Sequence, residues 1–341
     1  WMTTPPYPWR GLSLDIARSF FPWPVLKRLV DRLAGLGLNV LHLHLTDDQG
    51  WRLEIPGRPE LTARSGHTAI RGGEAGYLTV AEWTGLVEYA AARGVTVVPE
   101  IDLPGHVNAA LSACPELNQS GVTPEPYDGD DVGISQLTVG PATAAWLRDV
   151  LGAVAALTPG PYLHIGGDEC PGLSEADFVT LVTLATDIVE AAGKQPVAWQ
   201  EAAVAGLGDR IIYQFWMSVD YEPAWTVESP DEPAVVTSAR RSRAALLREA
   251  ERGARVIMSP ARYTYLDHKT GPDDQRGVDW AGHVSLEKAG SWDPVAILPD
   301  LDPTRILGVE AAMWTEYTHT EADLLAMLFP RLDAIAGVAQ G

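Results

Sequence analysis

The sequence predicts a (β/α)8 barrel of the TIM-barrel type, and three observations support this α/β fold class. The chain has 341 residues, a length that suits one barrel of roughly 250 residues or more with insertions. Short apolar runs alternate with helical patterns from end to end, which is typical of parallel α/β folds. Polar residues follow nearly every apolar run, as expected where barrel strands open onto a site. We therefore interpret residues 1–341 as a single barrel domain.

Eight apolar runs are candidate strands, because a buried parallel strand reads as a continuous series of hydrophobic residues. Eight strands with mostly helical connections fit a closed barrel better than a doubly wound sheet. The runs cover residues 11–16, 39–45, 95–101, 162–166, 196–200, 211–216, 255–258 and 308–312.

Helical patterns and long loops occupy the segments between these runs. Pro24 suits the first turn of a helix, and Ser174 suits an N-cap. Long loops that follow strands gather at the C-terminal face of a barrel, together with the chemistry. The expected helices cover residues 24–35, 80–93, 141–157, 174–192, 238–252 and 321–329, and the expected loops cover about 46–78, 102–140, 219–237 and 260–305.

The composition limits the partners that we expect for this chain. Its formal net charge of −20 argues against nucleic acid and anionic membranes, because both require basic patches. No apolar run reaches the roughly 18 residues of a membrane span. Cys114 and Cys170 are too few for a disulfide framework, and Cys170 is expected to be a packed thiol. No signal-peptide pattern opens the sequence, so its compartment stays undecided, with secretion slightly favoured.

The most informative segment is 162–169, where an apolar run breaks at two glycines and ends in Asp168 and Glu169. These carboxylates should stand where a buried strand emerges from the core. Two carboxylates held this close cannot both ionise freely. One should remain an anion while the other serves as a proton donor near neutral pH. We predict that this pair is the catalytic centre.

Polar and aromatic residues at the other strand ends predict acid/base chemistry on an uncharged, ring-shaped ligand. Acids and an arginine can hydrogen-bond sugar hydroxyls, while indole faces pack against a pyranose ring. A single tryptophan at a strand end is more often a core residue, so the tryptophans count only together with neighbouring polar groups. The residues are Asp15, Arg18, Asp47, Asp48, Glu100, Asp102, His106, Trp199, Trp216, Tyr265, Asp267, Trp314 and Glu316.

His42 and His44 permit another hypothesis, a metal-dependent barrel hydrolase. Two residues apart, they share one face of a strand, as paired metal ligands do. They lie inside the apolar run 41–45 and not at its open end, which favours buried, hydrogen-bonded histidines. We therefore predict no metal and no other cofactor.

Five ordered segments resemble the catalytic barrel of glycoside hydrolase family 20, the β-N-acetylhexosaminidases. An isolated Asp-Glu pair carries no family information, but five motifs in order over residues 9 to about 335 are specific. Family members commonly carry a small α/β domain ahead of the barrel. None is expected here, so we interpret the chain as a catalytic fragment or a single-domain member. The segments are RGLSLDIAR at 10–18, LHLHLTDDQGW at 41–51, PEIDLPGH at 99–106, HIGGDE at 164–169 and EAAMWTE at 310–316.

The resemblance implies a role for each matching residue. Glu169 corresponds to the general acid/base, and Asp168 to the carboxylate that orients and stabilises the 2-acetamido group of the substrate. Tyr265 would hydrogen-bond the carbonyl oxygen of that group. The other matching residues would wall the acetamido pocket (Trp199, Trp216 and Trp314), grip the ring 3- and 4-hydroxyls (Arg18), hold the hydroxyls at the far edge (Asp267 and Glu316) and support Glu169 (Asp47, His106 and Asp102).

The implied reaction is retaining and substrate-assisted, with an oxazolinium intermediate formed by the substrate's own acetamido oxygen. The expected activity is exo-acting removal of terminal β-linked GlcNAc, or GalNAc, from chito-oligosaccharides or glycans. An endo-acting hydrolase of poly-GlcNAc is the alternative within the same class. A catalytically silent sugar-binding module is the alternative from another class, and it is disfavoured because both carboxylates are present.

Overall fold

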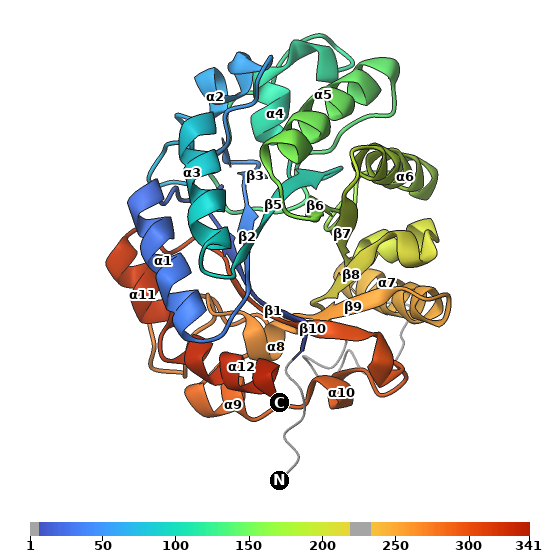
Figure 1. Ribbon diagram of the computed structural model, residues 1–341. Coiled ribbons are helices and arrows are strands. Elements are labelled where there is room, and N and C mark those ends of the chain that lie inside the picture. Colours follow the sequence, from blue (N-terminus) through green and yellow to red (C-terminus); the bar gives the residue numbers. More distant parts are fainter. Residues whose placement is uncertain (1–6, 219–232) are drawn as a thin grey trace.

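Eight parallel strands close into a barrel in the part of the chain that the structure describes (Figure 1). A computed structural model describes residues 7–218 and 233–341. The strand order is β1-β10-β9-β8-β7-β6-β5-β2, so the first strand pairs with the last. This closed barrel confirms the predicted fold class. The strands are β1 (Trp9–Asp15), β2 (Val40–His44), β5 (Thr96–Leu103), β6 (Tyr162–Gly166), β7 (Gln195–Trp199), β8 (Ile212–Phe215), β9 (Arg255–Met258) and β10 (Ile306–Met313).

Each predicted run overlaps one barrel strand, and the ends differ by at most two residues. The agreement has a physical cause. Parallel barrel strands are covered on both faces, so their sequences are almost uniformly apolar and easily recognised.

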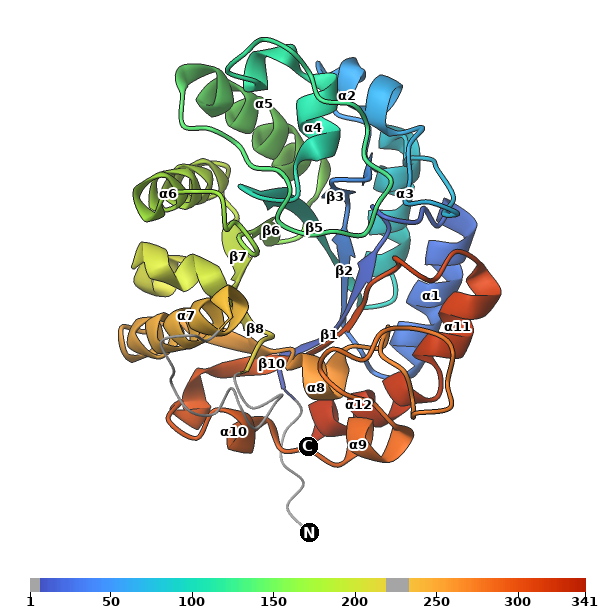
Figure 2. The same cartoon turned by 180° about the vertical axis from the view of Figure 1, so that it is seen from behind.

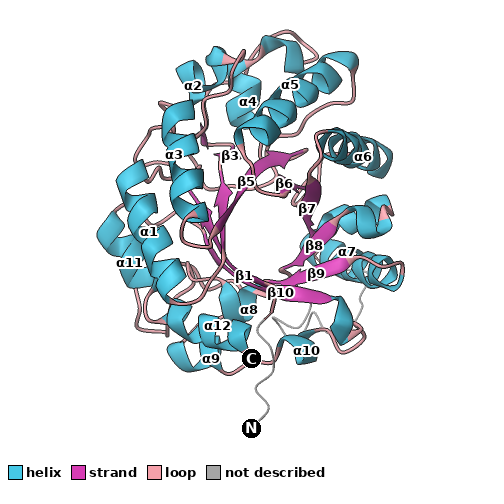
Figure 3. Ribbon diagram, viewed as in Figure 1, coloured by secondary structure: helices cyan, strands magenta, loops and turns pink. Residues whose placement is uncertain are grey.

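Helices surround the barrel on its outside in both views (Figures 2 and 3). The helix α7 begins at Ala234, inside the predicted loop 219–237, whereas residues 219–232 of that loop lie outside the described part of the chain. No helix in the described segments is long and apolar enough to cross a membrane. The longer helices are α1 (Trp23–Gly35), α3 (Val80–Ala91), α5 (Pro141–Leu157), α6 (Glu175–Ala191), α7 (Ala234–Glu251), α11 (Glu321–Leu328) and α12 (Arg331–Gln340).

Three predicted loops contain short regular elements, so the loop expectation was wrong in detail. Such elements span one or two turns, are too short to show a hydrophobic period and depend on tertiary packing. The connection from β7 to β8 is likewise built from 3-10 helices, η2 and η3, and α7 packs against η2. The short elements are β3 (Thr46–Asp47), β4 (Gly50–Trp51), α2 (Pro59–Ser65), α4 (Asn108–Ala113), η1 (Pro115–Leu117), η2 (Gln200–Ala205), η3 (Gly208–Arg210), α8 (Ala261–Thr264), α9 (Leu286–Gly290), α10 (Pro294–Ile297) and η5 (Pro303–Arg305).

The interior of the barrel is layered, because alternate residues of each strand point inward. Apolar side chains form one cluster inside the barrel at the N-terminal ends of the strands, including Trp9, Val40 and Ile257. Two residues further along, the inward positions are polar and buried, as in His42 and Glu310. The next positions reach the C-terminal ends, where the predicted site residues lie. The layering therefore places a buried polar level directly beneath the site.

Arg331, at the start of α12, anchors the segment that follows β9. Its guanidinium is buried and donates hydrogen bonds of 2.5–3.0 Å to the backbone carbonyls of Leu266, His268, Val284 and Met327. Three of these carbonyls belong to the segment 260–305. Helix α12 thus holds in place a loop that carries predicted site residues.

We expect Arg331→Met to lower the free energy of unfolding by about 3 kcal/mol or more, because four buried carbonyls lose a charged donor. Denaturant unfolding followed by circular dichroism measures the change. The matched control is Arg28→Met, which removes an exposed pair with Glu321 at 2.7 Å. The control should cost less than about 1 kcal/mol. Equal losses in the two variants would contradict the anchoring role.

Candidate active site

A pocket of about 390 Å³ opens at the C-terminal ends of the barrel strands. Residues that follow seven of the eight strands line it, which is the arrangement expected of an active site in this fold. Three strand-end candidates without a role implied by the family resemblance, Asp15, Asp48 and Glu100, are not on the lining. Of the twelve residues to which the resemblance assigns a role, eleven are on it: Arg18, Asp47, Asp102, His106, Asp168, Glu169, Trp216, Tyr265, Asp267, Trp314 and Glu316.

The backbone after β6 turns sharply, and this turn brings Asp168 and Glu169 to the pocket. Gly166 and Gly167 have φ values of 67° and 104°, in a region that favours glycine. A Cβ at Gly166 would lie 1.6 Å from Oδ1 of Asp102. Glu169 itself has a φ of 44°, which is uncommon for a residue with a side chain. Gly166 is therefore required by the close approach of the chain to β5, and Gly167 by its positive φ.

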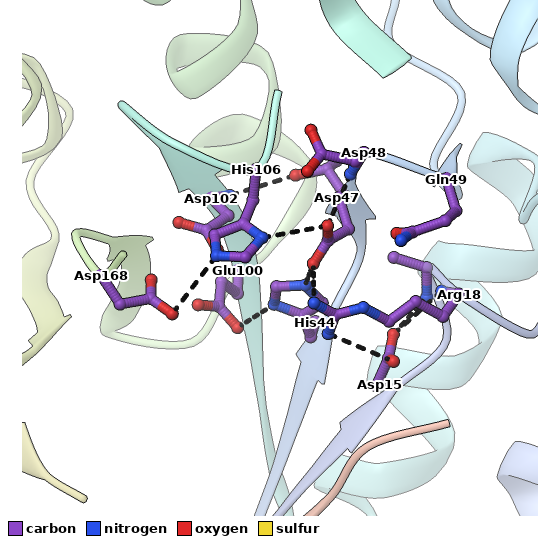
Figure 4. A network of polar contacts seen from close by, with 12 residues as sticks. Asp15, Arg18, His44, Asp47, Asp48, Gln49, Glu100, Asp102, His106 and Asp168 are labelled. Atoms are coloured by element: carbon purple, nitrogen blue, oxygen red, sulfur yellow. Dashed lines mark hydrogen bonds and ion pairs between the residues drawn. The ribbon is translucent and has the colours of Figure 1, made fainter. Parts of the chain in front are cut away.

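His106 lies between Asp168 and Asp47 (Figure 4). Its Nδ1 lies 3.1 Å from Oδ1 of Asp47, while its Nε2 lies 3.4 Å from Oε2 of Glu169 and 3.8 Å from Oδ2 of Asp168. His106 and Asp47 are almost fully buried. The structure thus brings together the Asp47–His106–Glu169 chain that the family resemblance implied.

Arg18 forms the wall next to Asp47. Its guanidinium contacts Asp47 Oδ2 at 2.9 Å, Asp15 Oδ2 at 3.5 Å and Glu316 Oε1 at 3.5 Å. Burial opposes its charge, but these carboxylates outweigh burial and hold the pKa of Arg18 above its usual value. Arg18 is therefore a fixed cation at one edge of the pocket.

The Asp47–His106 pair is charged. Burial opposes ionisation of Asp47, but Arg18 and His106 outweigh it and hold the pKa of this carboxyl well below its usual range. Burial also opposes protonation of His106, but Asp47 raises the pKa of the imidazole well above its usual value. An imidazolium held by a carboxylate therefore faces both Asp168 and Glu169.

Asp168 has a shifted pKa, as expected for one member of a close carboxylate pair. Burial raises the pKa of Asp168 to about 6. The charge on Glu169 adds to this increase, whereas His106 opposes it. Its Oδ1 is buried and has no hydrogen-bond partner among the described residues. The carboxylate thus has an unused acceptor in the pocket, and a donor from a ligand would favour its charged form.

Aromatic rings form the opposite wall of the pocket. Trp216 and Tyr265 are stacked, with centroids 6.2 Å apart and an interplanar angle of 6°. Trp314 meets Tyr265 edge to face at 6.0 Å. Among the twelve residues with an implied role, Trp199 is the one that is not on the lining. Its ring centroid lies 5.8 Å from that of Trp314, and its indole N–H donates a hydrogen bond to Glu100. Trp199 packs in one cluster with Trp216, Tyr265 and Trp314, and its role as a wall of the acetamido pocket stays a prediction.

Residues 7–339 match the catalytic domain of glycosyl hydrolase family 20. The chain belongs to this family. A beta-N-acetylhexosaminidase of Cellulomonas fimi is 44% identical over 336 residues, which are 98% of this chain and 64% of that protein. A beta-hexosaminidase of Vibrio furnissii is 35% identical over 98% of this chain and 56% of its own length.

Solved structures of the family agree with the fold. The Streptomyces plicatus N-acetyl-beta-hexosaminidase in complex with Thio-NAglucal is 41% identical, with a TM-score of 0.90 over 99% of this chain and 64% of that one. The chain therefore spans less than two thirds of the length of these three relatives.

The histidines that prompted the metal hypothesis lie in the polar layer of this family 20 barrel. His42 Nδ1 lies 2.9 Å from Glu310, and His44 lies 2.7 Å from Glu100 and 2.8 Å from Asp47. Burial opposes their protonation, but the carboxylates raise the pKa of His42 to about 9 and that of His44 well above its usual value. A protonated imidazole has no lone pair for a metal. The geometry therefore favours histidines that are ion-paired with carboxylates, and it agrees with the predicted buried, hydrogen-bonded state.

Sequence reasoning missed several residues of the site. Trp280, Val132, Asp130 and Tyr317 line the pocket from loops, where no strand-end pattern marks them. Glu201 accepts a hydrogen bond of 3.0 Å from the Trp216 indole N–H, and burial together with Asp168 raises its pKa to about 8. Only its position two residues after Trp199 could have indicated Glu201.

We expect Asp47→Asn to lower the pKa of the His106 imidazole, which is raised in the wild type. The substitution removes the anion that stabilises the imidazolium, and burial then favours the neutral ring. An NMR titration of the His106 side chain measures the shift. Asp177→Asn, at the exposed start of α6, is the control and should leave the titration unchanged. An unchanged pKa in Asp47→Asn would show that another group holds the charge.

Proposed function

We propose that this family 20 domain is an exo-acting β-N-acetylhexosaminidase that removes terminal β-linked GlcNAc by a retaining, substrate-assisted reaction. The observation that carries the proposal is the position of Asp168 and Glu169. Both carboxylates face the same nitrogen of His106, at 3.8 and 3.4 Å. Carboxylates on one side of a pocket do not flank a glycosidic bond as acid and nucleophile must. The nucleophile is therefore assigned to the substrate's acetamido oxygen.

In this proposal Glu169 moves the protons. It donates a proton to the leaving oxygen as the bond from that oxygen to the anomeric carbon breaks, while the acetamido oxygen bonds to the same carbon. It then takes a proton from the water that opens the oxazolinium ring. Its partly exposed side chain suits this exchange with water, and the charged Asp47–His106 pair beside it supports its orientation.

Asp168 and Tyr265 hold the acetamido group. The unused Oδ1 of Asp168 is the acceptor for the amide N–H and the anion that stabilises the positive charge of the intermediate. The Tyr265 hydroxyl is the donor for the carbonyl oxygen. Trp216 and Trp314 enclose the methyl group between apolar faces.

The charged edge of the pocket binds the sugar hydroxyls. Arg18 hydrogen-bonds the 3- and 4-hydroxyls of the sugar, and Asp267 and Glu316 hydrogen-bond the hydroxyls at its far edge. Burial, opposed by Arg18, raises the pKa of Glu316 to about 7. A pocket closed at this edge by three polar side chains favours exo action over endo-acting cleavage of poly-GlcNAc. Chito-oligosaccharides and glycans that end in GlcNAc are the proposed substrates, with GalNAc as a second terminal sugar.

Glu169→Gln should reduce turnover of an aryl β-GlcNAc substrate by about 10²–10⁴-fold, because general acid/base catalysis is lost. Steady-state kinetics measure the loss. Glu175→Gln, on the exposed first turn of α6, is the matched control and should keep normal turnover. Near-normal turnover in Glu169→Gln would overturn the proposed function, and binding of GlcNAc without turnover in the wild type would favour the silent module.

The value of kcat/KM should fall as the pH drops below about 6, because Asp168 must be anionic and burial raises its pKa to about 6 in the free site. Above that pH the carboxylate is charged and the acid limb should reach its plateau. The kcat profile should show this limb at lower pH, since the bound amide N–H favours the anion. The acid limb should be absent from the pH profile of the residual activity of the Asp168→Asn variant. A limb that persists in this variant would assign the titration to another group.

A further inference from the structure

Two exposed side chains that line the pocket are hydrogen-bonded to each other and join two separate loops. The Tyr317 hydroxyl, on the segment after β10, donates a 2.5 Å hydrogen bond to Oδ2 of Asp130, on the segment between β5 and α5. Both residues line the pocket. We call this pair the Tyr317–Asp130 clasp.

The loop that carries Asp130 is tied to the Arg18 side of the pocket. The Gln49 side chain donates a hydrogen bond of 2.8 Å to the carbonyl of Gly129, and the Arg71 backbone N–H donates one of 2.8 Å to the carbonyl of Asp128. The neighbouring Ile70 N–H donates to the carbonyl of Arg18. The position of Asp130 is therefore fixed relative to Arg18.

The segment that carries Tyr317 is tied to the same edge. Thr315 donates its backbone N–H and its hydroxyl to Oδ2 of Asp15, at 3.1 and 3.0 Å. Glu316, the residue before Tyr317, contacts the Arg18 guanidinium. The clasp thus stands beside the Arg18–Glu316 contact, where the proposed function places the hydroxyls farthest from the bond that breaks.

Stability alone does not account for the clasp. Tyr317 is 58% exposed, and hydrogen-bonded pairs at such positions contribute little to the free energy of folding. The hydrogen bond to Asp130 raises the pKa of Tyr317 to about 12, so the phenol keeps its donor proton at ordinary pH. What the pair does provide is a bridge between two anchored loops over one edge of the pocket.

We propose that the Tyr317–Asp130 clasp is a specificity determinant that excludes 2-acetamido sugars whose 3- or 4-hydroxyl carries a further sugar. The inference rests on the proposed function and extends it. An unsubstituted terminal sugar ends at Arg18 and Glu316. A sugar attached to its 3- or 4-hydroxyl would have to pass where the clasp joins the two loops, so the clasp would have to open.

The test compares two aryl β-glycosides, one of GlcNAc and one of a disaccharide in which the GlcNAc unit carries a hexose at its 3- or 4-hydroxyl. The measured quantity is the ratio of kcat/KM for the substituted to the unsubstituted glycoside. Tyr317→Ala and Asp130→Ala should each raise this ratio by about tenfold or more. Discrimination against a substrate that rests on a few contacts is typically of this size. Tyr317→Phe should raise it less, since the ring remains and only the hydrogen bond is lost.

Tyr127→Phe is the matched control, because Tyr127 also hydrogen-bonds an aspartate of the same loop, Asp131 at 3.2 Å, but does not line the pocket. Its ratio should equal that of the wild type. The clasp proposal alone would be overturned if Tyr317→Ala and Asp130→Ala kept their activity on the unsubstituted glycoside and gave the same ratio of kcat/KM values as this control. A wild type inactive on the unsubstituted glycoside would overturn the proposed function, and the clasp proposal with it. Thermal unfolding of each variant checks that the fold persists.

Discussion

The rest of this barrel depends on the contacts that neutralise one buried carboxylate, that of Glu100. A carboxylate without partners in such an interior would be strongly destabilising. Its two oxygens lie 2.7–3.0 Å from nitrogens of His42, His44, His164 and the indole of Trp199. These partners come from β2, β6 and β7, so the neutralising contacts exist only when the strands close in register. Burial opposes ionisation, but the histidines hold the pKa of Glu100 well below its usual range.

From this centre, charges of alternating sign extend to the pocket, and each one is held by the next. His44 links Glu100 to Asp47, and Asp47 holds both Arg18 and His106. His106 then faces Asp168 and Glu169. Because the interior screens these charges weakly, the protonation state of each group depends on its neighbours. The proposed chemistry of Glu169 therefore rests on contacts that reach well below the pocket.

The rim of the pocket is built from different elements than its base. The base is built from strand ends whose positions the barrel fixes, whereas Trp280, Asp130 and Tyr317 come from loops that can change without disturbing the barrel. Such a division lets the loops determine which substituents a sugar can carry while the proposed reaction centre stays the same. The clasp is an example in which two loops are bridged by one hydrogen bond.

The sequence alone determined the barrel, because buried parallel strands are recognisable as apolar runs, and it determined most of the base of the site, because strand ends in this fold converge. It also marked Asp168 and Glu169, since two glycines before a carboxylate pair indicate a sharp turn. Only the tertiary structure decided the short elements within the loops, the place of Trp199 off the pocket lining and the raised pKa of Asp168. Each of these depends on contacts between segments far apart in the chain, and local sequence patterns carry no record of such contacts.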